Sequence, residues 1–312
     1  MNIVLILPEK AYQSFVHGEV WGEDIDSLGI KKAIESLEGY NCEILTSNII
    51  NYLNGINRLE EKNFSVAIHF DWPSVLIEKC KNILFFQQYY EDVLLQRAWT
   101  DFKNFDLVIT NSYNISKKHK DILYFPLAVD TELFSVGKKI ESLKSDVVFI
   151  GNTKMRDDES YEQYLKPATK FDLKIYGNGW DKEAFNFYKP YYEGIISIEE
   201  MVKVYQSTNI VLCIHNKAYI EKYGLITNRV FQALSTGKVL VSDFHPAMIE
   251  MFPNEKGVIY TKGHEHTEQI LEELLNDPEK RMKIAQQGRN EVLKNHTWLN
   301  RLDPVFKKIG RQ

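Results

Sequence analysis

The chain has 312 residues, of which 44% are hydrophobic and 26% are charged, and its formal net charge is −5. This length and balance fit two globular domains with a substantial core. The weak negative charge argues against general binding to nucleic-acid phosphates.

The N-terminal segment and the cysteines indicate the cytoplasm. The apolar run at residues 3–7 has no basic region before it, which predicts a first β-strand and not a signal peptide. No stretch reaches the length of a transmembrane segment. Cys42, Cys80 and Cys213 are far apart and odd in number, which predicts buried thiols without disulfides or a zinc site.

The first half predicts strands that alternate with helices. The expected strands are residues 3–7, 42–45, 66–70, 83–86 and 107–110. Between the first two, Ile30, Ile34 and Leu37 recur at helical spacing, Ser27 can cap the start and Gly39 can end the helix. Strands bounded by helices indicate βαβ units and a parallel sheet.

The second half repeats this scheme. The expected strands are residues 146–150, 173–176, 210–214, 239–242 and 258–260, and the Lys-rich segment 135–145 predicts a linker. The helical pattern over 268–294 breaks at Asp277-Pro278, and an amphipathic piece at 299–310 follows. We therefore predict two doubly wound α/β domains, residues 1–140 and 141–298, and a final helix within 299–312.

In such folds ligands bind at the carboxyl ends of the strands. Thr227 or Asn228 can cap a helix that Gly237 ends, and a helix N-terminus suits a diphosphate. Arg229 lies in the first turn, where a cation is unfavourable without an anion, and Gln232 shares its face. A capped helix with a solvated arginine is the alternative.

Other strand ends of the second half carry glycines and polar groups. They are Gly151 and Asn152, then Tyr176, Gly177 and Asn178, then Tyr192 and Gly194, and Asn216 after His215. Glycine permits close backbone approach to a ligand, and Tyr192 can hold a flat base. An ordinary connecting loop is the alternative at each position.

In the first half, His69 and Asp71 lie two residues apart at a strand end. On an extended chain they would point the same way and form a polar pair for a reacting centre. A structural histidine is the alternative. His17 begins a polar, glycine-containing segment that is either a mobile loop over a cleft or a plain surface loop. No metal constellation appears, since Asp157-Asp158 indicates a solvated loop, and no Walker-type loop is present.

Six motifs of the second half occur in an order typical of one family. They are FIGN within DVVFIGNT (146–153), KIYGNGW (174–180), Tyr-x-Gly at 192–194, VYQSTNIVLCIHN (204–216), NRVFQALSTGKVLVSD (228–243) and NHTWLNRL (295–302), and YFPLAVDTELF (124–134) precedes them. Over residues 124–302 the chain resembles the group 1 glycosyltransferases, most closely the spore-maturation CgeB-like branch. The first 120 residues match only in their general α/β pattern.

The resemblance implies the GT-B fold, with two facing Rossmann-like domains and a cleft between them. It places the acceptor in the N-terminal domain and a nucleotide sugar, such as a UDP- or GDP-sugar, in the C-terminal domain. The helix in 299–312 would cross back to the N-terminal domain. Arg229 and its helix N-terminus would hold the diphosphate, and the Tyr192–Gly194 loop would hold the base. Neither a metal nor another cofactor is implied.

The resulting expectation is a hexosyltransferase-type glycosyltransferase of the retaining type, in bacterial-type cell-surface or protein glycosylation. The acceptor is unidentified and is a glycan, lipid, protein or small molecule. Gln232 departs from the family, which commonly has Glu there to receive the ribose hydroxyls. Two alternatives stay open: a GT-B-fold nucleotide-sugar epimerase, and a catalytically weak nucleotide-sugar-binding partner protein.

Overall fold

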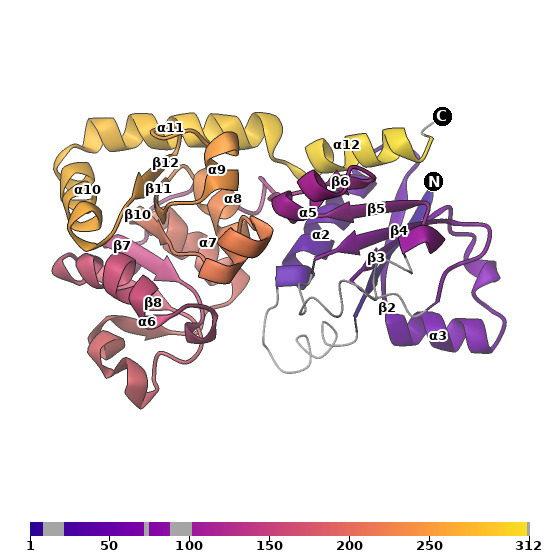
Figure 1. Cartoon of the computed structure of the whole chain (residues 1–312), viewed down its shortest axis with the longest axis horizontal. Helices are drawn as coiled ribbons and strands as arrows, with labels where there is room; N and C mark the ends of the chain where they lie inside the picture. Colours follow the sequence, from indigo (N-terminus) through magenta and orange to yellow (C-terminus); the bar gives the residue numbers. More distant parts are fainter. Residues whose placement is uncertain (9–21, 72–74, 88–101, 311–312) are drawn as a thin grey trace. The chain divides into compact units, whose positions relative to one another are not determined.

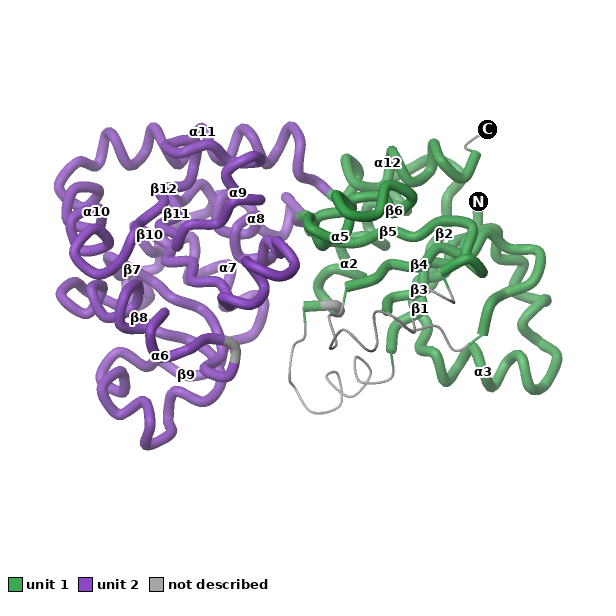
Figure 2. The backbone as a smooth tube through the Cα atoms, in the orientation of Figure 1, with its two compact units in different colours: residues 1–128, 298–312 green, residues 129–297 purple. Residues whose placement is uncertain are grey.

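The structure, a computed structural model, describes residues 1–8, 22–71, 75–87 and 102–310. The chain divides into two compact units: residues 1–128 with 298–312, and residues 129–297 (Figure 2). Each unit contains one six-stranded parallel sheet flanked by helices (Figure 1). Residues 129–140, assigned above to the first domain, lie in the second unit.

The sheet of the first unit has the strand order β2-β1-β3-β4-β5-β6. Its strands are β1 (Asn2–Leu7), β2 (Asn41–Thr46), β3 (Val66–Phe70), β4 (Lys81–Phe86), β5 (Leu107–Thr110) and β6 (Ile122–Tyr124). Five of them confirm the expected strands. The sixth, β6, was missed because it is three residues long and buries only Ile122 fully.

The helices of the first unit flank this sheet. They are α2 (Gly22–Glu35), α3 (Ser47–Gly55), α5 (Tyr113–Lys118) and α12 (Trp298–Lys308), with short 3-10 turns η1 (Glu60–Lys62) and η2 (Phe102–Asn104). The prediction that Ser27 caps α2 is wrong, because Ser27 lies inside the helix and its Oγ donates to the Asp24 carbonyl at 2.9 Å. Carboxylates near the helix N-terminus favour the earlier start.

Helix α12 completes the core of the first unit, although it follows the whole second unit in sequence. Its buried face consists of Trp298, Leu302, Val305 and Phe306, which join the strand residues in one hydrophobic cluster. The Trp298 ring stacks on Phe125 with the ring centroids 6.2 Å apart.

The sheet of the second unit has the strand order β12-β11-β10-β7-β8-β9. Its strands are β7 (Ser145–Ile150), β8 (Leu173–Tyr176), β9 (Tyr192–Gly194), β10 (Thr208–Cys213), β11 (Val239–Asp243) and β12 (Val258–Thr261). Five confirm the expected strands, whereas β9 lies where a loop was expected. After β9 the chain returns to the other side of β7, so β7 and β10 flank the topological switch.

The α-helices of the second unit are α6 (Asp158–Ser160), α7 (Ile198–Ser207), α8 (Asn228–Ser235), α9 (Pro246–Met251), α10 (His264–Asn276) and α11 (Pro278–Asn295). Its shorter turns are η3 (Glu141–Leu143), η4 (Thr153–Met155), η5 (Tyr161–Leu165), η6 (Lys166–Lys170), η7 (Glu183–Tyr191) and η8 (Tyr219–Tyr223). The predicted break between the last two long helices is confirmed, and Asp277 caps α11 by accepting from the Lys280 N–H at 2.9 Å.

The predicted linker is not a free segment. The Gln206 side chain donates to the Ser135 carbonyl at 2.8 Å, and the Ile140 N–H donates to Ser207 Oγ at 3.0 Å. Both partners lie at the end of α7, so this segment runs along the second unit. None of the helices in the described ranges is both long and apolar enough to cross a membrane.

The packing of α2 against α12 predicts a strong effect of Gly29→Ala. A Cβ at Gly29 would lie 2.3 Å from Trp298 Nε1 and 2.6 Å from its Cδ1, so the indole would have to move. We expect the clash to cost about 1–3 kcal/mol, outweighing the ~1 kcal/mol that alanine gains over glycine in a helix. Urea denaturation measures this. Gly55→Ala in α3 is the matched control, because no atom lies within 4 Å of the added Cβ; equal stability of the two variants would contradict the prediction.

Candidate functional site

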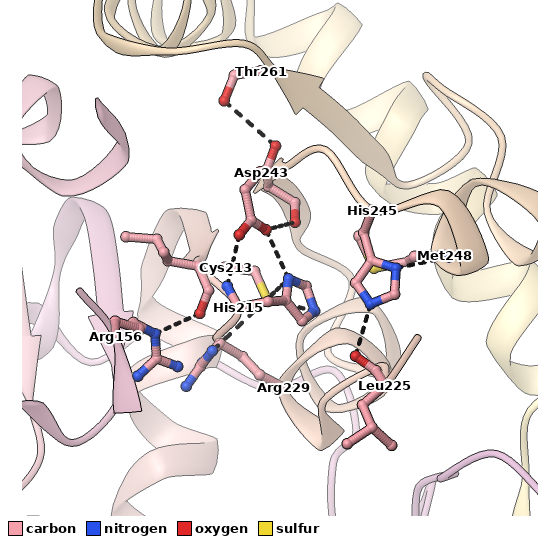
Figure 3. Close-up of polar contacts among 11 residues, drawn as sticks. Arg156, Cys213, His215, Leu225, Arg229, Asp243, His245, Met248 and Thr261 are labelled. Atoms are coloured by element: carbon pink, nitrogen blue, oxygen red, sulfur yellow. Dashed lines mark hydrogen bonds and ion pairs between the residues drawn. The ribbon is translucent and has the colours of Figure 1, made fainter. Parts of the chain in front are cut away.

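Polar residues of the second unit gather where β7, β10 and β11 end. Gly151 follows β7, His215 lies two residues beyond β10, and Asp243 is the last residue of β11. Because all the strands are parallel, these ends share one edge of the sheet, and β7 and β10 flank the switch where α/β sheets bind ligands. Figure 3 shows the residues that surround this edge.

Two half-buried arginines meet at this edge. Arg156 Nε donates to the Ile214 carbonyl at 2.6 Å, and its Nη1 donates to the Asn152 carbonyl at 3.2 Å. Arg229 Nη1 donates to Cys213 Sγ at 3.7 Å (Figure 3). Both guanidinium carbons lie over the Phe149 ring, at 5.1 and 5.3 Å from its centroid. The ring faces offer each cation a favourable contact and help to hold the two like charges together.

The space at Gly151 shows how closely the two guanidinium groups approach. A Cβ on Gly151 would lie 2.9 Å from Arg229 Nη2 and 3.2 Å from Arg156 Nη1. Glycine therefore leaves room for both groups to reach one spot. Within the described ranges, no carboxylate oxygen lies within 4.0 Å of either guanidinium.

Burial and the neighbouring Arg229 charge lower the pKa of Arg156 to about 10, so Arg156 stays protonated at neutral pH. Two positive charges without a carboxylate partner form an arrangement that an anion with two charged groups would stabilise.

Helix α8 presents its N-terminus at the same edge. Arg229 is its second residue and Thr227 is its N-cap, but the Thr227 side chain does not cap the helix. Thr227 Oγ1 is buried and has no hydrogen-bond partner in the described part of the chain. The unsatisfied N–H groups and the positive end of the helix dipole add to the charge of the arginine pair. Gly237, with φ of 73°, follows the helix as expected.

Gln232 lies one turn after Arg229. The residue is 5% exposed, yet its side-chain amide makes no hydrogen bond to the residues that the structure describes. A side-chain amide offers one acceptor oxygen and two donor hydrogens to a polar ligand. Gln232 is thus available to pair with a ligand bound at the arginine pair.

A buried polar cluster lies behind the arginines. The Asp243 carboxylate accepts twice from His215: Oδ2 from the backbone N–H at 2.9 Å, and Oδ1 from ring Nδ1 at 2.7 Å. Ser242 Oγ also donates to Asp243 Oδ1, at 3.1 Å. The other ring nitrogen of His215, Nε2, lies 3.8 Å from Cys213 Sγ (Figure 3). The chain of contacts therefore runs from Asp243 through His215 to the sulfur that accepts from Arg229.

Charges within this cluster shift its pKa values. Burial alone would lower the pKa of His215, but Cys213 and Asp243 outweigh it and raise the pKa to about 10. Burial alone would raise the pKa of Asp243, but His215 and the hydrogen bonds lower it. Burial also disfavours the Cys213 thiolate, yet His215 and Arg229 lower the pKa of the thiol to about 7. The pair His215–Asp243 is thus ionised at neutral pH.

His245 packs against His215 in a neutral state. The ring centroids lie 4.7 Å apart. His245 Nε2 donates to the Leu225 carbonyl at 2.7 Å, and its Nδ1 accepts from the Met248 N–H at 3.3 Å, capping α9 (Figure 3). Burial and the charge of His215 lower the pKa of His245 to about 4.

The glycine-rich strand ends tie β7, β8 and β9 together. Gly151 accepts from Trp180 Nε1 at 2.7 Å, and Asn152 Oδ1 accepts from the Asn178 N–H at 2.8 Å. Gly177 has φ of 132°, and a Cβ there would lie 2.4 Å from the Gly151 carbonyl oxygen, so this close approach needs glycine. These contacts fix the backbone beside the arginine pair.

The remaining predicted donor residues lie around these strand ends. Tyr176 is buried, at 3% exposure, whereas Tyr192 is half-buried at the start of β9, two residues before Gly194. Asn216 Oδ1 accepts from the Tyr219 N–H at 3.3 Å. Asn228 is the first residue of α8.

The candidate residues of the first unit are not placed as expected. His69 is fully buried in β3, and its Nε2 donates to Asn82 Oδ1 at 3.0 Å, which is a structural contact. Asp71 has φ of 58°, so the chain is not extended there, and its Oδ1 accepts from the Gln87 N–H at 2.9 Å. The expected side-by-side orientation on an extended strand is therefore wrong. His17 lies outside the described residues.

Sequence reasoning missed Arg156 and Asp243 as site residues. Arg156 stands in the charged run MRDDES, where solvation is the simpler interpretation. Asp157 of that run caps α6 by accepting from the Ser160 N–H at 2.8 Å. Asp243 is the last residue of β11, the neighbour of β10 in the sheet. A carboxylate at this strand end could have been predicted as a site residue from the sequence. No group of three side chains suited to hold a metal ion occurs among the described residues.

Part of the chain matches a known protein family. Residues 156–307 match the model of a family described as glycosyl transferase-like. The matched segment begins at Arg156 and includes both arginines and the His215–Asp243 pair. No curated protein matches the chain by sequence.

Solved structures share the fold of the whole chain. A glycosyltransferase from Rickettsia africae has a TM-score of 0.69 at 12% identity, covering 100% of this chain and 99% of that one. Sucrose-phosphate synthase from Thermosynechococcus elongatus has a TM-score of 0.71 at 10% identity, covering 99% of both chains. T4 phage BGT, in complex with its UDP-glucose substrate, has a TM-score of 0.62 at 16% identity, covering 100% of both chains. The chain thus has the GT-B fold, and the fold with the family match supports a glycosyltransferase.

The buried titratable groups of this cluster predict a loss of stability as the pH falls below 6.5. Unfolded histidine has a pKa of about 6.5, whereas folded His245 has one of about 4, so the unfolded state binds more protons as the pH falls below 6.5. For His215 the folded pKa is about 10, so its stabilisation is lost as the pH rises from 6.5 to 10. Between about pH 7 and 9 Cys213 offsets this loss, because the pKa of its thiol falls from 9.0 in the unfolded chain to about 7 in the folded one. We expect a loss of about 1–3 kcal/mol in the free energy of unfolding between pH 6.5 and 4.5.

Urea denaturation across pH 4.5–9 measures this profile. His245→Asn should flatten the acid side, because an asparagine can cap α9 without taking up a proton. His264→Asn is the control, since His264 is over one-third exposed. An unchanged acid slope in the His245 variant would show that other groups set it.

Proposed function

We propose that the chain is a glycosyltransferase that binds a nucleoside-diphosphate sugar, in particular a UDP-sugar, at the carboxyl edge of the second sheet. The observation that carries the proposal is the arginine pair: Arg156 and Arg229 converge over Gly151 without a described carboxylate partner. A diphosphate supplies two linked anionic groups, which suits two guanidinium groups. UDP-glucose is the substrate in the complex of T4 phage BGT, which shares this fold.

The chemistry we infer is stabilisation of the leaving group. As the bond between sugar and diphosphate breaks, negative charge grows on the diphosphate, and the arginine pair with the α8 N-terminus would stabilise it. Gln232 would pair with the ribose hydroxyls, and the edge at Tyr192 and Gly194 would hold the base. We propose a retaining outcome, transfer of a hexose and membership of the CgeB-like branch from the resemblance over residues 124–302.

The acceptor stays open to a glycan, lipid, protein or small molecule, and we propose a role in cell-surface or protein glycosylation. The three cysteines are free, which fits the reducing cytoplasm that we propose as the location. A catalytically weak nucleotide-sugar-binding protein would use the same arginine pair. Release of UDP from UDP-glucose, with transfer to an acceptor or to water, distinguishes an enzyme from such a binding protein.

Alanine substitution of the arginines tests the site. We expect Arg156→Ala and Arg229→Ala each to weaken UDP binding by about 10–100-fold, because a charge-assisted hydrogen bond is worth about 1.5–3 kcal/mol. Isothermal titration calorimetry measures the affinity. Arg58→Ala is the matched control, since Arg58 is exposed and pairs with Glu61 in the first unit. Unchanged affinity in both site variants would overturn the proposed function.

Gln232 tests the ribose contact. Gln232→Leu should weaken UDP binding by about 1–3 kcal/mol, because ribose hydroxyls would be left buried and unpaired. Gln232→Glu should change the affinity by less than about tenfold, since a stronger acceptor is offset by added negative charge near the diphosphate. Titration of UDP into the wild-type protein and the two variants measures these affinities. Wild-type affinity in the Leu variant would show that Gln232 does not contact the ribose.

We predict turnover without an added divalent metal, because the arginine pair and the helix dipole would carry the charge of the leaving diphosphate. UDP release should persist in excess chelator at no less than about half the rate measured without it. T4 phage BGT, which shares this fold, has been observed in complex with UDP and Mn²⁺, so manganese is the metal to add back in this experiment. Loss of turnover in the chelator, with recovery in manganese, would contradict metal independence.

A further inference from the structure

We infer that Asp243 and His215 are positioning residues of the arginine pair: the carboxylate of Asp243 holds His215 on two sides, and this fixes the two acceptors to which Arg156 and Arg229 are hydrogen-bonded. The inference rests on the proposed function, because it concerns how that diphosphate site is shaped. Neither residue need touch the ligand.

The acceptors of both arginines lie on one short stretch of chain. Arg156 donates to the carbonyl of Ile214, and Arg229 donates to the sulfur of Cys213. His215 follows directly, just beyond the end of β10. The ladder between β10 and β11 reaches only Cys213, which pairs with Ser242. Beyond that point the orientation of the chain depends on side-chain contacts.

Asp243 supplies those contacts. One carboxylate oxygen accepts from the His215 backbone N–H, which fixes the peptide that carries the Ile214 carbonyl. The other accepts from the ring, which fixes the imidazole beside Cys213 Sγ. Ser242 Oγ holds that same oxygen from the β11 side, and Thr261 Oγ1 donates to the Ser242 carbonyl at 3.4 Å (Figure 3). An unbroken series of contacts therefore links β11 to the acceptor of each arginine.

The Asp243 side chain and His215 are buried, with side-chain exposures of 7% and 0%. A carboxylate has two acceptor oxygens, whereas an asparagine has one acceptor and one donor group. Asp243→Asn therefore cannot accept both hydrogen bonds from His215. Either one contact breaks, or the ring becomes neutral and accepts from the new amide; in both cases the His215–Asp243 ion pair is lost while the size of the side chain is kept.

A double-mutant cycle on UDP affinity tests the coupling. We expect Asp243→Asn to weaken UDP binding about tenfold in the wild-type background and less than about threefold in the Arg156→Ala background, because part of its effect passes through Arg156. Equal factors in the two backgrounds, or unchanged UDP affinity in a folded Asp243→Asn protein, would overturn the inference.

Ser145→Ala is the matched control for loss of a buried hydrogen bond. Ser145 Oγ donates to Thr208 Oγ1 at 3.0 Å where β7 and β10 begin, at the opposite edge of the same sheet. This variant should lower the stability of the protein while leaving its UDP affinity within about twofold of wild type. A tenfold loss of affinity in Ser145→Ala would show that any weakening of the sheet disturbs the site and would overturn the assignment to Asp243.

If Asp243→Asn does not fold, two variants of His215 test the inference instead. The amide of His215→Asn can still donate to Asp243, as ring Nδ1 does, and its backbone N–H is kept, so UDP affinity should stay within about threefold of wild type. His215→Leu removes the side-chain contact and should lose about tenfold. Equal affinity of the two variants would overturn the inference. If the wild-type protein itself does not bind UDP, the proposed function fails, a result distinct from failure of the positioning role.

Discussion

The second unit is organised around two like charges held side by side. Two guanidinium groups repel each other, so the protein must supply contacts that keep Arg156 and Arg229 converged when no anion is bound. It does so with the Phe149 ring, the Ile214 carbonyl and the Cys213 sulfur. The glycine at position 151 leaves the space into which both groups point. The diphosphate that we propose as the ligand would complete an arrangement that the fold has already prepared, so little reorganisation would accompany its binding.

The topology of the sheet makes this convergence possible. Phe149 comes from β7, the two acceptors come from β10 and its end, and these strands are neighbours only because the chain changes direction after β9. Arg156 arrives from the connection after β7, and Arg229 from the first turn of α8. The two cations are thus 73 positions apart in sequence but meet at one strand edge. The Asp243 carboxylate then links that edge to the next strand, β11.

The strands were predictable because most are buried apolar runs. The expected bounds of β3, β5 and β8 coincide with the observed ones, since each is enclosed by polar or glycine-containing turns. By contrast, β6 and β9 are three residues long, and β9 is an aromatic-glycine segment whose pairing depends on its neighbour β8. The site was partly predictable: the α8 motif pointed to Arg229 and Gln232. Arg156 was not, because only the fold shows that this member of a charged run turns back to the Ile214 carbonyl. The His69–Asp71 hypothesis failed in its geometry because the backbone leaves the extended conformation at Asp71.

The place of α12 has a consequence for how the protein is made. A ribosome releases β1 to β6 first, then the whole second unit, and only afterwards the helix that carries Trp298, Leu302, Val305 and Phe306. During translation the first unit therefore lacks part of its core, whereas the second unit contains all its own strands and can fold earlier. The order of folding would then reverse the order of synthesis. In this interval the apolar residues that later contact α12 would be exposed, and exposed apolar surface of this kind favours aggregation until the helix packs.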